Sequence, residues 1–112
     1  MNTLINLTPH RISIIDPDTK EVAHVPPSGS VARVAMSRLR INDLAPGVAV
    51  FATSFGALEG LPPAEAGVVY LVSLVVAQAA AKQGRVDILS PGELVRGPDG
   101  QPVGCLGLSS PL

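Results

Sequence analysis

The chain has one long apolar segment, GVVYLVSLVVAQAAAKQGRVDILS, at residues 67–90. Val68–Val72 consists of β-branched, aromatic and leucine residues, which favour a buried strand. From Ser73 the composition changes to leucine, alanine and glutamine, which favour a helix that Gly84 ends. Val86–Leu89 then has the composition of a second strand. The segment therefore predicts a strand, a helix and a second strand parallel to the first.

Ser73 stands where the predicted first strand gives way to the helix, which is expected over residues 73–83. Its hydroxyl can cap the helix by accepting a hydrogen bond from the backbone two or three residues on. Alternatively, the free N–H groups of the helix N-terminus can attract an anion at this edge of the sheet. The capping interpretation is favoured, because the turn lacks the glycines that let a phosphate approach closely.

The rest of the chain predicts short strands separated by turns. A chain of 112 residues with 46% hydrophobic content forms one domain, residues 1–112, around a modest core. Eleven glycines and eleven prolines indicate many turns. Further strands are expected at residues 4–7, 11–15, 21–25, 30–35, 47–56, 94–96 and 103–108. The predicted fold is an α+β class, small β-rich domain of about seven or eight short strands, with one principal helix in the strand–helix–strand unit.

Two stretches need a separate interpretation. Residues 47–56, GVAVFATSFG, carry apolar residues on both faces, which is typical of a strand buried in the middle of a sheet. Met36–Asp43, just before it, has no clear periodicity and is either a short strand or an irregular arm. Ser90–Glu93, reading SPGE, is expected to turn the chain.

Charge and composition exclude several classes of partner. A net charge of −1 gives no field that holds nucleic acid, and one Tyr, two Phe and no Trp provide no stacking platform for bases. Val68–Ala81 is too short to span a membrane. Cys105 is alone and the histidines are distant, so we expect no disulfide, no metal site and no cofactor. No secretory signal is visible, which predicts a cytoplasmic protein.

His10 lies in a predicted loop after Thr8 and Pro9, where a stiff backbone can position a polar group. With Ser73 as nucleophile and Asp16 or Asp87 as the orienting acid, it could form a hydrolytic site. No GxSxG motif supports that assembly. The alternative is a turn histidine whose ring bonds the backbone.

Arg33 and Asp87 are the other candidates for ligand contact. Arg33, with Arg38 and Arg40, forms either a small anion-facing patch or an ordinary solvated face. Asp87 lies between Val86 and Ile88, on the opposite side of the predicted strand from both. That side is either solvent or a pocket near Ser73, where the carboxylate would orient a ligand hydroxyl.

Four motifs occur in an order that resembles a known group of proteins. They are NLTPH at Asn6–His10, PPSG at Pro26–Gly29 followed by VARV, EGLP at Glu59–Pro62, and YLVS with VAQA at Tyr70–Ala79. The chain resembles, over most of its length, a group of small uncharacterised proteins of actinobacteria, other bacteria and phages. The resemblance implies a phage or mobile-element lineage and no catalytic residues.

The sequence thus leads to three hypotheses. The first is a non-enzymatic binding protein, a phage or mobile-element accessory factor, such as a counter-defence protein, that sequesters a small anionic, nucleotide-like ligand or blocks a host protein. Its ligand-facing residues would be Ser73, His10, Arg33 and Asp87. The second is a small hydrolase or transferase that uses His10 and Ser73. The third is a structural or assembly protein whose strand edges pair in a homo-oligomer. Whether His10, Arg33 and Ser73 share one concave surface discriminates among them.

Overall fold

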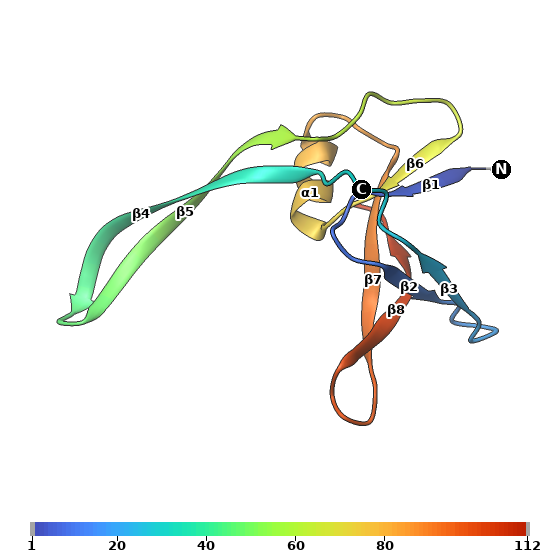
Figure 1. Cartoon of the computed structure of the whole chain (residues 1–112). Coiled ribbons are helices and arrows are strands. Elements are labelled where there is room, and N and C mark those ends of the chain that lie inside the picture. Colours follow the sequence, from blue (N-terminus) through green and yellow to red (C-terminus); the bar gives the residue numbers. More distant parts are fainter. Residues whose placement is uncertain (1, 112) are drawn as a thin grey trace.

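The computed structural model describes residues 2–111 of the protein and contains eight strands and one helix within them (Figure 1). This confirms the small β-rich α+β fold. The elements are β1 Thr3–Asn6, β2 Ile12–Ile15, β3 Val22–Val25, β4 Arg33–Ala45, β5 Val48–Glu59, β6 Val68–Leu71, α1 Leu74–Lys82, β7 Ile88–Arg96 and β8 Pro102–Ser109.

Six strands form one sheet in the order β1-β6-β7-β8-β2-β3. β6 and β7 are parallel, with Tyr70 opposite Ile88, and α1 connects them, so the predicted strand–helix–strand unit is confirmed. Gly84 ends the helix with a φ of 81°, a left-handed conformation that glycine adopts without strain. The second strand begins at Ile88 rather than Val86, because the chain leaves the helix through an extra turn.

The predicted turn at Ser90–Glu93 is wrong, since these residues lie inside β7 and face β8. β7 pairs with β6 only at Ile88 and Leu89, so from Ser90 onward β8 is its one neighbour. A proline is tolerated in such an edge-like stretch. Gly92 is needed because a Cβ there would collide with the carbonyl oxygen of Leu106.

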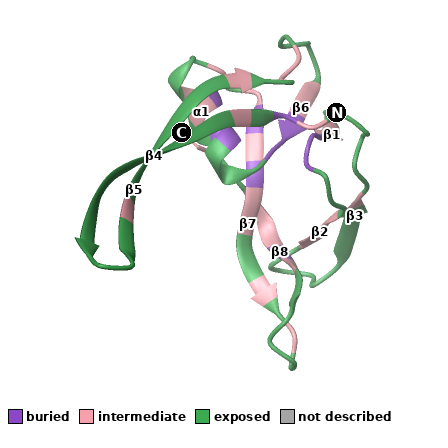
Figure 2. Cartoon of the chain, turned by 60° about the vertical axis from the view of Figure 1, so that its left-hand side comes forward, coloured by how far each residue is buried: buried purple, intermediate pink, exposed green. Residues whose placement is uncertain are grey.

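The core lies between α1 and one face of the sheet (Figure 2). The helix buries Val76, Ala77 and Ala80, whose spacing of three and four residues places them on one face. The buried core residues they join are Leu7, Ala32, Tyr70, Val72 and Ile88. Val34 and Leu58, at the base of β4 and β5, pack against this cluster.

The sheet curls so that its two edge strands meet at Asn6, which is buried at the end of β1. Its Nδ2 donates hydrogen bonds to the carbonyl oxygens of Val25 (3.0 Å) and His10 (2.8 Å). Its Oδ1 accepts from the backbone N–H of Thr8 at 2.9 Å. Because Val25 ends β3 at the opposite edge, one satisfied amide joins both edges. The NLTPH motif therefore has a structural role.

β4 and β5 form a separate antiparallel pair that projects away from the sheet as a long arm (Figure 1). A turn at Pro46 and Gly47 joins them. The arm raises the radius of gyration to 16.9 Å, compared with about 13 Å for a compact chain of this length. The prediction that residues 47–56 lie buried in the middle of a sheet is wrong, because β5 has only β4 beside it. Helix α1 covers only the base of the arm and not the rest of its length.

Candidate functional site

The arm gathers the large apolar side chains that the described residues leave exposed. Seven of the thirteen such residues lie on it, so they are not scattered as surface apolar residues usually are. They are Met36, Leu39, Ile41, Leu44, Val48, Phe51 and Phe55. Figure 2 shows the arm as almost entirely exposed over its length. Exposed apolar side chains gathered on one element in this way are typical of a site where another molecule binds.

The pairing of β4 with β5 defines the two faces of the arm, because residues directly opposite each other share a face. Met36 lies opposite Phe55, and Arg40 lies opposite Phe51. Phe51 and Phe55 are four positions apart along β5, an even number, so both phenylalanines lie on one face. We call this the phenylalanine face and define it as Met36, Arg38, Arg40, Phe51, Thr53 and Phe55.

The composition of the phenylalanine face differs from that of the rest of the chain. Phe51 and Phe55 are the only phenylalanines in the sequence, and they are 45% and 59% exposed. The guanidinium carbon of Arg38 lies 4.6 Å from the centroid of the Phe51 ring, which is a cation–π arrangement. Aromatic residues, methionine and arginine are the types enriched in protein–protein interfaces. The opposite face carries no aromatic residue and pairs Ser37 with Ser54, Leu39 with Ala52 and Ala45 with Val48.

Two hollows flank the base of the arm where it meets α1, with volumes of about 410 and 360 Å³. Both are lined by Val34, Phe55 and Val75, and we call them together the arm-foot groove. The charged residues among those lining it are Arg33 in the first hollow and Lys82 in the second. The other lining residues are largely apolar, so the groove is an apolar surface that carries these two positive charges.

Arg33 and Ser73 line the same hollow, as the shared-surface hypothesis expected. The Ser73 hydroxyl accepts a hydrogen bond from the backbone N–H of Val76 at 3.4 Å, so the N-cap interpretation is confirmed. The capping bond turns the serine oxygen toward the helix. Arg33 is exposed at the start of β4.

His10 lies apart from this pair, in a different hollow of about 490 Å³ that Cys105 and Pro91 also line. Its carbonyl oxygen accepts from Asn6, which holds the turn. Within residues 2–111 its imidazole makes no hydrogen bond, so the expectation that the ring bonds the backbone is wrong. His10 is exposed at this turn.

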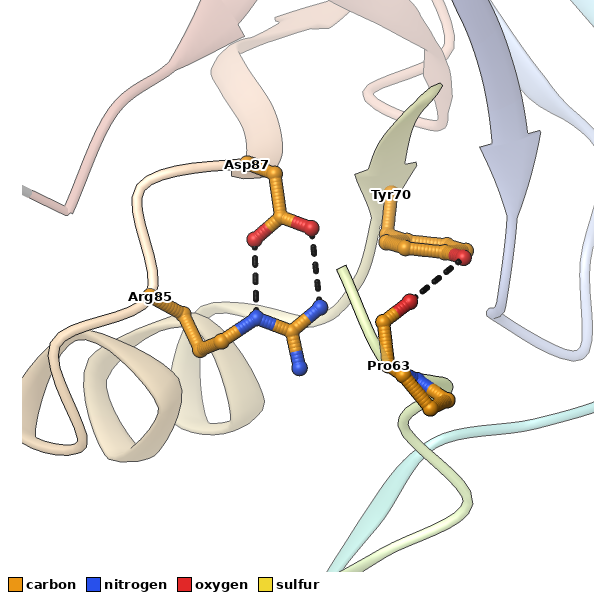
Figure 3. Close-up of polar contacts among 4 residues, drawn as sticks. All are labelled: Pro63, Tyr70, Arg85 and Asp87. Atoms are coloured by element: carbon orange, nitrogen blue, oxygen red, sulfur yellow. Dashed lines mark hydrogen bonds and ion pairs between the residues drawn. The ribbon is translucent and has the colours of Figure 1, made fainter. Parts of the chain in front are cut away.

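Asp87 forms an ion pair with Arg85, in the turn between α1 and β7 (Figure 3). Arg85 Nε donates to Oδ1 at 2.9 Å and Nη2 donates to Oδ2 at 2.8 Å. The Arg85 guanidinium holds the pKa of Asp87 below its ordinary value of 3.8. The nearby Tyr70 hydroxyl donates to the carbonyl oxygen of Pro63 at 3.4 Å. Both carboxylate oxygens are thus occupied, and Asp87 lines neither hollow of the arm-foot groove.

Comparison of the chain with known protein families, curated proteins and solved structures finds no match. Over residues 2–111, the one helix is too short to cross a membrane. The same residues contain no group of three or more histidine, cysteine, aspartate or glutamate side chains placed to hold a metal ion.

The phenylalanine face was missed at the level of sequence, although a signal exists for the hairpin that carries it. Runs of similar length stand on either side of the Pro46–Gly47 turn, 13 residues in β4 and 12 in β5. Equal runs around a two-residue turn are typical of a hairpin. The apolar residues on both faces of residues 47–56 were instead interpreted as a sign that other strands of the same chain bury this segment.

Proposed function

We propose that this chain is a non-enzymatic binding protein that contacts another protein through the β4–β5 arm. The observation that carries this proposal is that Phe51 and Phe55 are exposed on the same face of a hairpin that no other strand of residues 2–111 covers. Aromatic anchors of this kind supply most of the binding energy in protein interfaces.

Physical chemistry favours a covered arm over a bare one. A two-stranded hairpin is marginally stable in water by itself. Burying one large apolar side chain contributes about 1.5–3 kcal/mol, so a partner that covers several of them would hold the arm in one shape. A ligand the size of a nucleotide is too small to cover strands of 13 and 12 residues. The arm therefore fits a protein partner.

The lineage implied by the motifs fits this activity. A phage or mobile-element accessory factor that blocks a host protein, or that assembles with a protein of its own, needs a contact surface and no catalytic group. We place the protein in the cytoplasm, where a single free cysteine such as Cys105 is ordinary.

Photocrosslinking in the cells that make the chain tests this proposal. Phe51 would be replaced with a photoreactive phenylalanine derivative, and Val86, which is 79% exposed but distant from the arm, would carry the same group as a control. We expect protein adducts from position 51 and not from position 86. Absence of protein adducts at 51, with the variant folded, would contradict the proposal.

A second candidate function is supported by one observation, the shared hollow of Arg33 and Ser73. It is the binding of a small anionic ligand, with the guanidinium supplying the charge. Titration calorimetry against nucleotides and cyclic nucleotides tests it, with Arg33→Gln as the variant and Arg11→Gln as a matched control. Binding that Arg33→Gln abolishes would support this candidate, and no binding to the unaltered chain would remove it.

The hydrolase or transferase hypothesis receives less support from the geometry. His10 and Ser73 line different hollows, and the Ser73 oxygen accepts a capping hydrogen bond. Nothing in this arrangement activates the serine as a nucleophile.

A further inference from the structure

We propose that the partner protein adds a strand to β5, so that its extended backbone pairs with the outer edge of the arm and its side chains pack beside Phe51 and Phe55. The inference rests on the proposed function, because it assumes that the arm is a protein contact surface. It adds the form of the partner segment, which is extended and uncharged, and the edge of the arm to which that segment binds.

The first argument concerns backbone hydrogen-bonding groups. β5 pairs with β4 on one side, and no other strand of residues 2–111 lies on its other side (Figure 1). In an antiparallel pair, alternate residues turn their backbone N–H and C=O groups away from the neighbouring strand. Within residues 2–111 these outward groups of Val48–Glu59 have no backbone partner. A row of such groups matches the backbone of another extended strand.

The second argument is that β5 lacks the features that protect strand edges. Proteins usually block an exposed edge with charged residues, prolines, bulges or a very short strand. Residues 48–58 contain no charged residue and no proline. Every residue from Val48 to Phe55 has a partner on β4, so no extra residue interrupts this part of β5. The edge is therefore long, regular and uncharged.

The other strand of the arm has the protection that β5 lacks. β4 carries the charged residues Arg38, Arg40 and Asp43. Ile41 and Leu44 have no partner on β5, because the pairing shifts register at each of them. Such bulges bend a strand and disrupt the ladder that a further strand would extend. The two edges of the arm therefore differ, and β5 is the one that accepts a strand.

The remaining strand edges are also protected. β1 and β3, at the two ends of the sheet, have four residues each, and Asn6 joins them. The free side of β7 beyond Leu89 carries Pro91 and Glu93. Pro102 begins β8. Among residues 2–111, Val48–Phe55 is thus the one long edge without protection.

The third argument concerns what a partner must supply when it covers the phenylalanine face. A protein that buries Phe51 and Phe55 also removes water from the adjacent edge of β5. Backbone N–H and C=O groups that lose water without gaining another partner destabilise the complex. A strand supplies backbone partners at the edge and alternate side chains on the face. A helix supplies only side chains, because its backbone groups bond within the helix.

The side chains of the arm indicate the composition of the added strand. Beside Phe51 and Phe55, β-branched and aromatic residues form favourable cross-strand pairs. A charged residue in the added strand would find no opposite charge within residues 48–58. We therefore expect an uncharged segment rich in β-branched residues and about as long as Val48–Phe55.

A synthetic peptide tests whether the edge accepts a strand. The probe is a fluorescently labelled peptide of alternating threonine and valine, as long as Val48–Phe55, with a lysine at each end for solubility. We expect saturable binding to the full chain in fluorescence anisotropy, with a dissociation constant of about 1 mM or lower. In the control peptide, two consecutive central residues are replaced by proline, which removes an N–H donor from each of its edges. It should bind at least about tenfold more weakly.

Proline substitutions on the arm test which edge binds. Leu39 lies opposite Ala52, and Arg38 lies opposite Thr53. Of two successive opposite pairs in an antiparallel ladder, one exchanges hydrogen bonds and the other faces outward. In the outward pair, a proline on either strand leaves the β4–β5 hydrogen bonds intact. Hydrogen–deuterium exchange of the four single proline variants shows which pair faces outward.

The two variants of the outward pair are matched, because they differ only in the strand that carries the proline. The proline on β5 should weaken binding of the probe peptide at least about tenfold, since it removes a donor from the binding edge. The proline on β4 should leave the dissociation constant unchanged. In cells, the β5 proline should abolish the protein adducts of a photoreactive group at position 51, and the β4 proline should preserve them.

Four outcomes would overturn the inference. The first is no binding of the probe peptide up to about 1 mM, and the second is equal binding of the probe and control peptides. The third is a β5 proline that weakens binding no more than the β4 proline. The fourth is that position 51 forms adducts only with a second copy of the chain. Adducts with a different protein that persist in the β5 proline variant would contradict strand addition and still support the proposed function.

Discussion

The protein contains two long antiparallel hairpins, β4–β5 and β7–β8, that have opposite surroundings. β7 pairs with β6 at its start and β8 pairs with β2, so this hairpin lies inside the six-stranded sheet and buries Ile88 and Cys105. β4 and β5 pair only with each other, and both phenylalanines stay exposed. Regular strand pairing is present in both hairpins. They differ in whether the same chain supplies the surface that covers them.

This contrast shows that an apolar, strand-forming sequence indicates that some surface covers the strand. It does not indicate whether the same chain or another molecule provides that surface. Where neighbouring strands and α1 are close, as at the β7–β8 hairpin, elements of the same chain cover the apolar side chains. Along the arm, α1 reaches only the base, near Val34 and Leu58, and the rest extends beyond any other element. Four predictions, from the largest expected effect to the smallest, test the contrast between the covered sheet and the bare arm.

The largest difference should appear between two leucines. Leu71 on β6 is 0% exposed and Leu39 on the arm is 70% exposed. Leu71→Ala should lower the free energy of unfolding by about 2–5 kcal/mol, because it removes buried contacts and leaves a cavity. Leu39→Ala should lower it by less than about 0.5 kcal/mol. Urea denaturation of the unaltered chain and of each variant measures both changes. Equal effects would show that the arm is covered within one chain.

The second largest effect on the free energy of unfolding is expected at Asn6, where the two edge strands of the sheet meet. Asn6→Ala removes a donor to the carbonyl oxygens of Val25 and His10 and the acceptor of the Thr8 N–H, which should cost about 3 kcal/mol. Ser13→Ala, which removes an exposed hydrogen bond to the His24 ring, should cost no more than about 0.5 kcal/mol. Chemical denaturation compares the two. A small effect at Asn6 would mean that the edges are held together by other contacts.

A smaller and pH-dependent effect is expected at Asp87. Asp87→Asn removes the paired carboxylate and should cost about 1–2 kcal/mol at pH 7. Because Arg85 lowers the pKa of Asp87 in the folded chain below 3.8, the stabilisation is complete above that pH and is lost as the pH falls through the lowered pKa. The two proteins should therefore converge in stability as the pH falls from 3.8 through the lowered pKa of Asp87. A difference that stays constant down to pH 2 would contradict this origin.

The smallest of these effects is expected at the helix N-cap. Ser73→Ala should lower the free energy of unfolding by about 0.5–1 kcal/mol, since the Val76 N–H loses its acceptor. Ser73→Asp keeps an acceptor at the N-cap and should restore most of the loss. Thermal unfolding of the three proteins gives the comparison. If Ser73→Asp were as unstable as Ser73→Ala, capping would not explain the position of this serine.

Most of the sheet could be predicted from the sequence, because local signals determine it. The change of composition at Ser73 and the glycine at position 84 marked the helix, and turn residues marked the β2–β3 and β7–β8 hairpins. The exposure of the arm could not be predicted, since the sequence of Val48–Glu59 has the same apolar pattern whether a neighbouring strand or another molecule covers it. The hydrogen bonds of Asn6 could not be predicted either, because their partners lie up to 19 residues away along the chain.

Of the candidate site, the sequence predicted two positions that the structure brings together, Arg33 and Ser73. His10 and Asp87 lie elsewhere because backbone and ion-pair contacts, which depend on the fold, determine their placement. The phenylalanine face depends on the register between β4 and β5, and no local pattern specifies that register.

Hydrogen–deuterium exchange of the full chain over a range of concentrations tests the central claim most directly. Because β4 and β5 pair only with each other within residues 2–111, the backbone amides of the arm should exchange faster than those of β6 and β7 at a low concentration of the chain. Arm amides that are as strongly protected as those of β6 and β7, in a chain that remains monomeric, would contradict the claim.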